Sequence, residues 1–568
     1  MKTDPILPQA RVQSMKQAGF WRGRTLLDYL DDCVARSPER TAIVDNRLAT
    51  GERQVLTYAE LGRRVERIAQ GLAALGVGTG DVVSYQLPNW WQFTALHLAA
   101  LRLGAITNPL MPIFRERELE FMLRLAEAKV FIVPKRFRDF DYEAMANGLR
   151  TKLPALGHVL VVGGDGPGAF ERLLDGSGKA DRGKADGGKA DGGKDSGGKA
   201  ARKPLAERRP APDDVVEIIF TSGTTGEPKG VMHTSHTLFS NIEPYAERLR
   251  LGKQDVVLMA SPMAHQTGFM YGLMMPIFLG GISVLLDTWN PARAVDLVAA
   301  ERVSFTMAST PFLLDLTNEA EKRKQDVDTL HTFLSAGAPI PRSLVRRAAD
   351  GLGARIVSAW GMTENGAVTT TRPDDRAEKI FETDGCPLPG MELRTIDPEG
   401  RPLGPDQQGR LQVRGCSNFV GYLKRPEWYG TDAEGWFDTG DLARLDADGY
   451  VRITGRSKDI LIRGGENVPV VEIEDLIYQH PAVLETAIVG MPDPRLGERG
   501  CAFVTLRPGQ SLTLKELVAF LETKKVAKQY LPERLEVIPA LPKTPSGKVQ
   551  KFRLREMAKA FGQAAPGA

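Results

Sequence analysis

The chain predicts an α/β fold: a large N-terminal domain of parallel-rich sheets with crossover helices, followed by a small α+β domain. First, its 568 residues exceed the roughly 250–300 that one hydrophobic core usually spans, so at least two domains are expected. Second, short β-branched runs alternate with helical patterns. Third, the composition changes near Gly455, where a glycine- and charge-rich stretch precedes about 110 residues of mixed strand and helix.

The first half of the chain supplies the clearest alternation. Apolar residues recur at helical spacing over 58–75, and the turn GVGTGD leads into a strand-like run from Val82. A second helix is predicted from Trp90 to Leu101, followed by extended segments at 105–110 and 130–133. Strands that alternate with helices indicate a parallel sheet with crossover connections.

Five further strand candidates follow, at 256–259, 282–286, 303–308, 332–337 and 355–360. In open parallel sheets, ligands bind where the loops at the carboxyl ends of the strands converge. Functional residues are therefore expected just after these segments.

Residues 256–286 contain no Lys, Arg, Asp or Glu, and their length alone would allow a membrane span. Four glycines, two prolines, His265 and Gln266 interrupt the run, so we interpret it as a buried strand–helix–strand. The N-terminus lacks the apolar stretch of a signal peptide. The four cysteines are scattered without metal-ligand spacing, which fits a cytoplasmic protein without structural zinc or a transmembrane segment.

Composition excludes several classes of protein. With 42% hydrophobic and 26% charged residues, the chain is neither wholly disordered nor fibrous. A net charge of +3 is too small to require nucleic acid or an anionic membrane as partner. The repeat GKADG fills a low-complexity insert at about 176–203. It has no apolar face and no aromatic residue for base stacking, so we expect a disordered, solvated linker rather than a nucleic-acid-binding tail.

The chemistry-bearing residues begin where the apolar run 218–220 leads into TSGTTGEPKG at 221–230. Four hydroxyls, glycine-freed backbone N–H groups and Lys229 are suited to hold phosphate oxygens. The spacing does not fit a Walker P-loop. The alternative is a plain hydrophilic loop, but such a dense run after a buried strand favours a phosphate site.

This segment resembles the phosphate-binding signature of the adenylate-forming superfamily, which includes acyl-CoA synthetases, peptide-synthetase adenylation domains and firefly-type luciferases. Four more of its motifs follow in order: WGMTE at 360–364, GWFDTGD at 435–441, GRSKD at 455–459 and PKTPSGK at 542–548. The resemblance implies an AMP- and acyl-binding domain at 1–456. It also implies a mobile lid domain at 457–568 that carries the adenylation lysine.

The reaction implied by the resemblance is that of an AMP-forming acyl-CoA synthetase, an acid–thiol ligase. A small-molecule carboxylic acid attacks the α-phosphorus of ATP, giving acyl-AMP and pyrophosphate, and the thiol of CoA then displaces AMP. Mg²⁺ accompanies the ATP. Both steps bring anions together, so catalysis should depend on charge neutralisation and positioning. The oligomeric state stays open between monomer and homodimer.

The resemblance also assigns residues to the nucleotide. The β- and γ-phosphates would be held by Thr221, Ser222, Gly223, Thr224, Thr225, Gly226 and Lys229. The loop on the adenine side, with the strand that follows, would comprise Gly337, Ala338, Pro339, Trp360, Gly361 and Met362. Trp360 would stack there or serve in the core. Asp441 would accept the ribose hydroxyls, assisted by Arg456.

The catalytic assignments concern four residues. Thr363 would contact the α-phosphate, and Glu364 would hold Mg²⁺, a hard cation that prefers oxygen ligands; a helix cap is the alternative for an isolated Thr-Glu pair. Lys548 would bridge the attacking carboxylate and the α-phosphate. His265 would lie near the acyl pocket and thioester channel, although a structural histidine is nearly as well supported.

The second half-reaction implies a domain rotation. Lys458 matches the hinge position of the superfamily, about which the small domain would turn after adenylation. The loop of Gly464, Gly465, Glu466 and Asn467 would then line the CoA channel.

Within the superfamily, SPMAHQ at 261–266 lacks the acid that peptide-synthetase domains use to pair a substrate amine, so an amino-acid substrate is not expected. The segments at 19–45, 459–475 and 527–556 look like the cyclohexanecarboxylate-CoA ligase branch and bacterial short- and medium-chain fatty acyl-CoA synthetases. Cyclohexanecarboxylate or a medium-chain fatty acid is therefore the expected substrate. The alternatives are an acyl-AMP ligase that loads a carrier protein and a non-catalytic acyl-adenylate binder.

Overall fold

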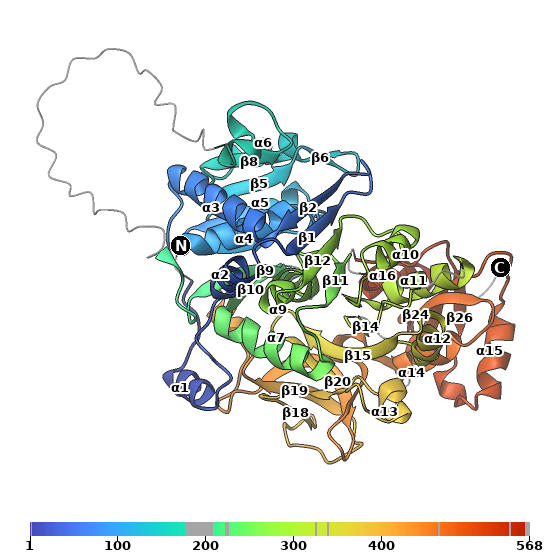
Figure 1. The fold of residues 1–568 in the computed structure, drawn as a ribbon. Coiled ribbons are helices and arrows are strands. Elements are labelled where there is room, and N and C mark those ends of the chain that lie inside the picture. Colours follow the sequence, from blue (N-terminus) through green and yellow to red (C-terminus); the bar gives the residue numbers. More distant parts are fainter. Residues whose placement is uncertain are drawn as a thin grey trace, which may run out of the picture.

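The computed structural model describes residues 1, 3–175, 208–221, 227–323, 327–337, 340–463, 466–544 and 547–562. The insert predicted at 176–203 lies outside the described residues. Within them the chain forms two sheets with helices packed around them, a third antiparallel sheet, and a C-terminal group of elements drawn in orange and red in Figure 1.

The largest sheet has nine strands in the order β17-β16-β15-β14-β13-β11-β12-β1-β2. Its six central strands run parallel to one another. They are β15 (Arg355–Met362), β14 (Thr332–Ser335), β13 (Phe305–Ala308), β11 (Val256–Met259), β12 (Ile282–Leu286) and β1 (Thr41–Asn46). The antiparallel edges are β2 (Arg53–Thr57), β16 (Gly366–Thr370) and β17 (Cys386–Pro387). The crossover helices are α10 (Pro291–Ala300), α11 (Thr310–Arg323) and α12 (Arg342–Leu352).

The second sheet has the order β10-β9-β4-β3-β5-β8. All neighbours are parallel except the β9/β10 hairpin. The strands are β3 (Val82–Tyr85), β4 (Ile106–Pro109), β5 (Ala128–Pro134), β8 (His158–Val162), β9 (Val215–Thr221) and β10 (Lys229–Thr234). α3 (Tyr58–Ala74) precedes β3, and the helices between later strands are α4 (Trp91–Arg102), α5 (Glu116–Leu125) and α6 (Tyr142–Arg150), with a short β6/β7 hairpin (Arg136–Phe137, Phe140–Asp141). The predicted α/β fold is confirmed.

The uncharged run 256–286 is a buried strand–helix–strand, as predicted. β11 leads into α8 (Gln266–Gly268), the π-helical turn η4 (Phe269–Met274) and α9 (Met275–Leu279), and β12 follows. Every residue of η4 is buried, so the absence of charge reflects burial inside the protein. Across the described part of the chain, no helix combines the length and apolar character that crossing a membrane requires.

Other elements complete the N-terminal domain. α1 (Gln9–Gln17) and α2 (Leu26–Arg36) precede β1, and α7 (Ser235–Leu249) follows β10. A four-stranded antiparallel sheet, low in Figure 1, comprises β18 (Met391–Ile396), β19 (Gly409–Gly415), β20 (Phe437–Leu445) and β21 (Val451–Arg456). α13 (Ala377–Glu382) lies between β16 and β17 in the chain.

The small C-terminal domain has its own sheet and its own core. Its strands are β22 (Leu461–Arg463), β23 (Glu466–Val468), β24 (Val483–Asp493), β25 (Gly497–Leu506) and β26 (Arg534–Val537), with helices α14 (Val470–Ile477), α15 (Leu514–Thr523) and α16 (Lys551–Gly562). Two hydrophobic clusters contain only residues from Leu461 onward. The turn η6 (Ser457–Asp459) connects this domain to β21.

Candidate active site

The carboxyl ends of the parallel strands bring several predicted residues together. His265 follows β11, Gly337 follows β14, and Trp360 to Met362 end β15. Ser309, which no motif singled out, follows β13. Convergence of the loops at this edge is what the fold class requires of a ligand site.

Two positions at this edge of the sheet require glycine. Gly337 has a φ of +82°, a conformation that side-chain-bearing residues rarely adopt. At Gly361 an added Cβ would lie 1.9 Å from the carbonyl oxygen of Gly366, so the β15/β16 hairpin accepts only glycine there. Ala338 and Pro339, predicted beside Gly337, lie outside the described residues.

The predicted phosphate loop connects two antiparallel strands. Thr221 ends β9, Lys229 begins β10, and the two are paired in register. The intervening Ser222, Gly223, Thr224, Thr225 and Gly226 lie outside the described residues. The Lys229 ammonium is 4.9 Å from the ring centroid of Tyr422 and 5.1 Å from that of Trp428, so the start of β10 faces two aromatic rings.

Glu364 is buried beside this lysine. The Tyr422 hydroxyl donates a 2.7 Å hydrogen bond to Glu364 Oε1. Burial raises the pKa of Glu364, and the Tyr422 bond and the charges of Lys229 and Arg456 oppose that rise. The preceding carbonyl, that of Thr363, lies 2.7 Å from His233 Nε2, so a buried histidine holds the WGMTE turn from behind.

Glu364 fits Mg²⁺ that arrives with phosphates. Mg²⁺ usually takes one or two carboxylates together with substrate oxygens and water. Within the described residues no group of three His, Cys, Asp or Glu side chains could form a complete protein cage. A single buried carboxylate near Lys229 fits a Mg²⁺ ion that takes most of its ligands from substrate and water.

Asp441 is held from two sides. It is 4% exposed, accepts a 2.8 Å hydrogen bond from Trp360 Nε1 at Oδ2, and pairs through Oδ1 with Arg456 Nε at 2.9 Å. The β20/β21 hairpin places Asp441 directly opposite Arg456. An ionised carboxylate has about four lone-pair sites, so both oxygens can still accept ligand hydroxyls. Trp360 packs in the main core and also orients Asp441.

Lys548 reaches this group from the C-terminal domain. Burial and the nearby Arg456 lower its pKa to about 8, and the negative charges of Asp441, Asp459 and Glu364 act in the opposite direction. The preceding Gly547 has a φ of +83°, and an added Cβ would lie 2.6 Å from Ser309 Oγ. Gly547 is therefore docked on the N-terminal domain where α11 begins.

His265 makes the structural contact that the sequence left open as an alternative. Its Nδ1 accepts a 3.3 Å hydrogen bond from the Thr267 N–H and caps α8. Burial and the charge of Lys548 lower its pKa to about 4. At neutral pH the ring is therefore uncharged with its proton on Nε2, and it lies close enough to Lys548 for electrostatic coupling.

Comparison with known families gives this geometry its context. The AMP-binding enzyme family model matches residues 30–423, and the model for the AMP-binding enzyme C-terminal domain matches residues 472–548. The chain belongs to the AMP-binding enzyme family. The adenylate-forming superfamily inferred from the motifs is thereby confirmed.

Relatives of this AMP-binding enzyme extend along almost its whole length. It is 36% identical to the medium-chain fatty-acid–CoA ligase of Escherichia coli over 559 residues, covering 98% of this chain and 94% of the relative. It is 30% identical to the vibriobactin-specific 2,3-dihydroxybenzoate-AMP ligase of Vibrio cholerae, covering 98% of both chains. The crystal structure of ATP-bound MatB from Rhodopseudomonas palustris superposes with a TM-score of 0.81 at 28% identity, covering 95% of this chain and 100% of that one.

These comparisons place the protein among adenylate-forming carboxylate ligases that use ATP, and it is an AMP-forming acid–thiol ligase. Its fold is that of the adenylating enzymes.

The motifs missed several residues that shape the AMP-binding enzyme's site. Tyr422, Trp428, His233 and Ser309 lie in segments with no recognisable catalytic spacing, and only the folded chain brings them to it. Conversely, Gly464 and Gly465 of the predicted CoA channel lie outside the described residues. Lys458, Glu466 and Asn467 are described only by their backbone.

Proposed function

We propose that this enzyme is an ATP-dependent carboxylate–CoA ligase whose substrate is cyclohexanecarboxylate or a medium-chain fatty acid. The observation that carries the proposal is the meeting of Lys548 with Glu364, Asp441 and Arg456, which come from two domains. Lys548 is coupled electrostatically to the other three, Arg456 pairs with Asp441 at 2.9 Å, and the charge of Arg456 also acts on Glu364.

In the first half-reaction, a carboxylate oxygen of the acid attacks the α-phosphorus of ATP, and the bond to pyrophosphate breaks. Lys548 would neutralise the attacking carboxylate and the α-phosphate, and Thr363 would contact the same phosphate. Lys229 and the loop from Thr221 to Gly226 would hold the outgoing phosphates. Glu364 would hold Mg²⁺, which supplies further charge neutralisation on the phosphates.

The nucleoside would be held by the opposite side of the site. Asp441 would accept the ribose hydroxyls, with Trp360 and Arg456 fixing its orientation. The segment around Gly337 to Pro339 and the strand residues Gly361 and Met362 would border the adenine. The ribose assignment is supported by the position of the Asp441 carboxylate, which is held by a hydrogen bond from Trp360 and an ion pair with Arg456.

In the second half-reaction, the thiol sulfur of CoA attacks the acyl carbon, AMP leaves, and the thiol proton passes to solvent. The C-terminal domain would turn about Lys458, withdraw Lys548 and bring Gly464 to Asn467 to the channel. His265, whose pKa burial lowers to about 4, would border that channel as a neutral ring.

The substrate class rests on two observations. The chain is 36% identical to a medium-chain fatty-acid–CoA ligase, and the segment after His265 is buried, apolar and rich in methionine, which suits an adaptable apolar pocket. A cytoplasmic location is part of the proposal, supported by four free cysteines, which fit a reducing compartment.

The deciding experiment measures AMP release from ATP, Mg²⁺ and CoA with a panel of acids: cyclohexanecarboxylate, butyrate to dodecanoate, benzoate and several amino acids. CoA-dependent turnover that peaks on alicyclic or medium-chain acids is the expected result. A peak on benzoate would contradict the substrate class. No turnover with any of these acids would contradict the substrate class as well.

A second candidate, an acyl-AMP ligase whose acceptor is a carrier protein, is favoured by one comparison. A relative named as a 2,3-dihydroxybenzoate-AMP ligase matches 98% of both chains. Pyrophosphate release that CoA does not accelerate, with acyl-AMP left on the enzyme, would support this candidate over the CoA ligase.

A further inference from the structure

Two residues of the proposed site, Lys229 and Glu364, contact the same side chain. The hydroxyl of Tyr422 donates to Glu364 Oε1 at 2.7 Å, and the ring of Tyr422 faces the Lys229 ammonium at 4.9 Å. The phosphate-loop lysine and the proposed metal ligand are 135 positions apart in the chain. Tyr422 connects them physically, although it belongs to none of the five motifs.

The backbone of Tyr422 is held on both sides. On one side the Leu423 N–H donates to the Gly230 carbonyl at 2.8 Å and the Met232 N–H donates to the Gly421 carbonyl at 3.1 Å, so this loop pairs with the start of β10. On the other side the Ile6 N–H donates to the Val420 carbonyl at 2.7 Å.

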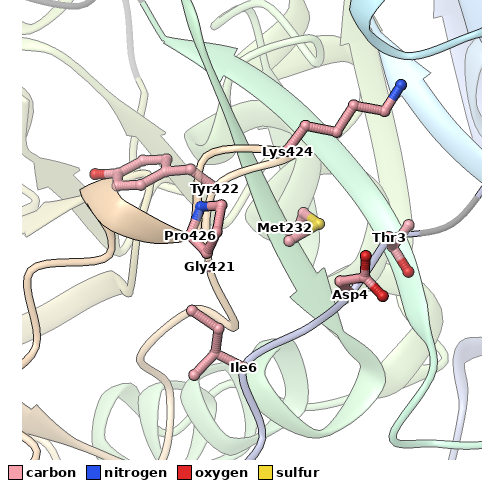
Figure 2. A pocket seen from close by; sticks show the side chains of 8 residues that line it. All are labelled: Thr3, Asp4, Ile6, Met232, Gly421, Tyr422, Lys424 and Pro426. Atoms are coloured by element: carbon pink, nitrogen blue, oxygen red, sulfur yellow. The ribbon is translucent and has the colours of Figure 1, made fainter.

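Figure 2 shows the direction in which the Tyr422 side chain extends. Tyr422 lines a small cavity together with Ile6, Thr3, Asp4 and Met232, and its ring extends away from those four side chains. Phe419 meets the Tyr422 ring at a centroid distance of 4.8 Å and an interplanar angle of 63°. These backbone bonds and the Phe419 contact support the direction of the ring.

The hydrogen bond has a direct chemical consequence. A tyrosine hydroxyl that donates to a carboxylate forms a charge-assisted bond, which fixes the plane of the carboxylate and occupies one side of Oε1. Partners of this kind orient metal-binding side chains and tune their affinity. The ring contributes separately, because its face and that of Trp428 attract the Lys229 ammonium.

We propose that Tyr422 is a positioning residue with two separable actions: its hydroxyl orients Glu364 toward Mg²⁺, and its ring orients Lys229 toward the triphosphate. This inference rests on the proposed function, in which Glu364 holds the metal and Lys229 the phosphates. The two actions use different atoms, so different substitutions can separate them.

The test measures binding without turnover. Mn²⁺, used in place of Mg²⁺, is titrated into the full-length enzyme with a non-hydrolysable ATP analogue, and bound Mn²⁺ is followed by electron paramagnetic resonance. Tyr422→Phe keeps the ring and is expected to bind Mn²⁺ roughly tenfold more weakly, with affinity for the metal-free analogue within twofold of wild type. Tyr422→Leu is expected to weaken both affinities.

A matched control is available elsewhere in the chain. The Tyr29 hydroxyl donates to Glu243 Oε1 at 3.0 Å in a buried setting, and neither residue belongs to the site. Tyr29→Phe removes the same type of bond and is expected to leave both affinities within twofold. Because metal-free analogue binding is measured on the same samples, a variant with a disrupted site is recognised directly.

Two results would overturn the inference in distinguishable ways. Equal Mn²⁺ affinity in wild type and Tyr422→Phe would refute the role of Tyr422 alone. A wild-type enzyme that binds the analogue but no Mn²⁺ would refute the proposed role of Glu364, and the role of Tyr422 with it.

Discussion

Lys548 is a partly buried lysine, and the surrounding charges determine the pKa of its ammonium group. Burial and Arg456 lower the pKa of its ammonium to about 8, while three carboxylates counteract them. At pH 7 most of the enzyme therefore carries the positive charge that adenylation is proposed to need. Raising the pH through 8 removes that charge, and the first half-reaction should slow accordingly.

The pH dependence of the first half-reaction tests this. We expect kcat/KM for acyl-AMP formation, which reports the free enzyme, to fall above about pH 8 with loss of one proton. Lys548→Arg carries a guanidinium that stays protonated to beyond about pH 12. The Lys548→Arg variant should be slower than wild type, but its kcat/KM should not fall above about pH 8. Pyrophosphate release between about pH 6.5 and 9.5 measures both enzymes. If kcat/KM of Lys548→Arg fell above about pH 8 as in wild type, the titrating group would be a residue other than Lys548.

Measuring the two half-reactions separately tests the role of Lys548 at a single pH. Lys548→Ala should lose acyl-AMP formation by about 10²-fold or more, because a preorganised charge at the reacting phosphate is removed. It should still convert supplied acyl-AMP and CoA to acyl-CoA at close to the wild-type rate. Both rates are measured on one preparation by quenched flow. Equal losses in the two steps would contradict the assignment.

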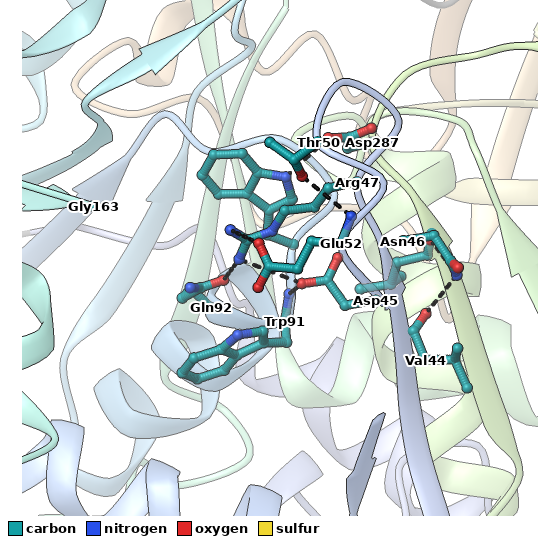
Figure 3. Close-up of polar contacts among 12 residues, drawn as sticks. Val44, Asp45, Asn46, Arg47, Thr50, Glu52, Trp91, Gln92, Gly163 and Asp287 are labelled. Carbon is teal, nitrogen blue, oxygen red and sulfur yellow. Dashed lines mark hydrogen bonds and ion pairs between the residues drawn. The ribbon is translucent and has the colours of Figure 1, made fainter. Parts of the chain in front are cut away.

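At the scale of elements, the junction between β1 and α4 contains a buried carboxylate, Asp45, among other charged side chains (Figure 3). Asp45 Oδ2 accepts a 3.3 Å hydrogen bond from the Trp91 N–H at the start of α4, and Arg47 Nη2 lies 3.7 Å from Oδ2. Asp287 and Glu52 add negative charge nearby. Burial raises the pKa of Asp45 to about 7.

The sign of the resulting pH dependence follows from linkage. The folded state holds the Asp45 proton more tightly than the unfolded state, so the contribution of Asp45 to stability is fully present below about pH 4. It is lost as pH rises to about 7. Asp45→Asn should remove this pH dependence. Between pH 5 and pH 8 the free energy of unfolding of the variant should therefore rise by roughly 1–4 kcal/mol relative to that of wild type. Urea unfolding at both pH values measures it; a constant difference would contradict the linkage.

The same scale shows what the sequence could and could not predict. Strands at 256–259 and 282–286 were predicted with their observed bounds, because short apolar β-branched runs between helices are typical of buried strands. The strand predicted at 332–337 ends at Ser335. The strand predicted from Val303 begins at Phe305, since Val303 still closes the turn after α10 through a bond to the Val298 carbonyl. Tyr422 could not be found, because its role depends on pairing with β10, and local pattern carries no information about distant partners.

For the molecule as a whole, the two domains are joined in one particular arrangement. Arg452 of β21 pairs with Asp475 of α14 at 2.7 Å, and Arg444 of β20 lies 3.9 Å from Glu472 of the same helix. Together with Gly547 against Ser309, these contacts keep Lys548 at the site. The proposed rotation about Lys458 would have to break them, so they should favour adenylation over thioester formation.

Asp475→Asn tests that balance. Burial raises the pKa of Asp475 to about 7, so the rates are compared at about pH 8, where this carboxylate is mostly ionised. Loss of a partly buried ion pair worth about 1 kcal/mol shifts a two-state equilibrium roughly fivefold. We therefore expect slower acyl-AMP formation, by about two- to fivefold, with acyl-CoA formation from supplied acyl-AMP unchanged or faster. Glu536→Gln is the control, because its pair with Arg534 lies wholly within the C-terminal domain. It should leave the ratio of the two rates as in wild type. A uniform decrease of both rates in Asp475→Asn would mean that the contact stabilises the fold and does not bias the domain arrangement, whereas opposite changes require two arrangements that share one site.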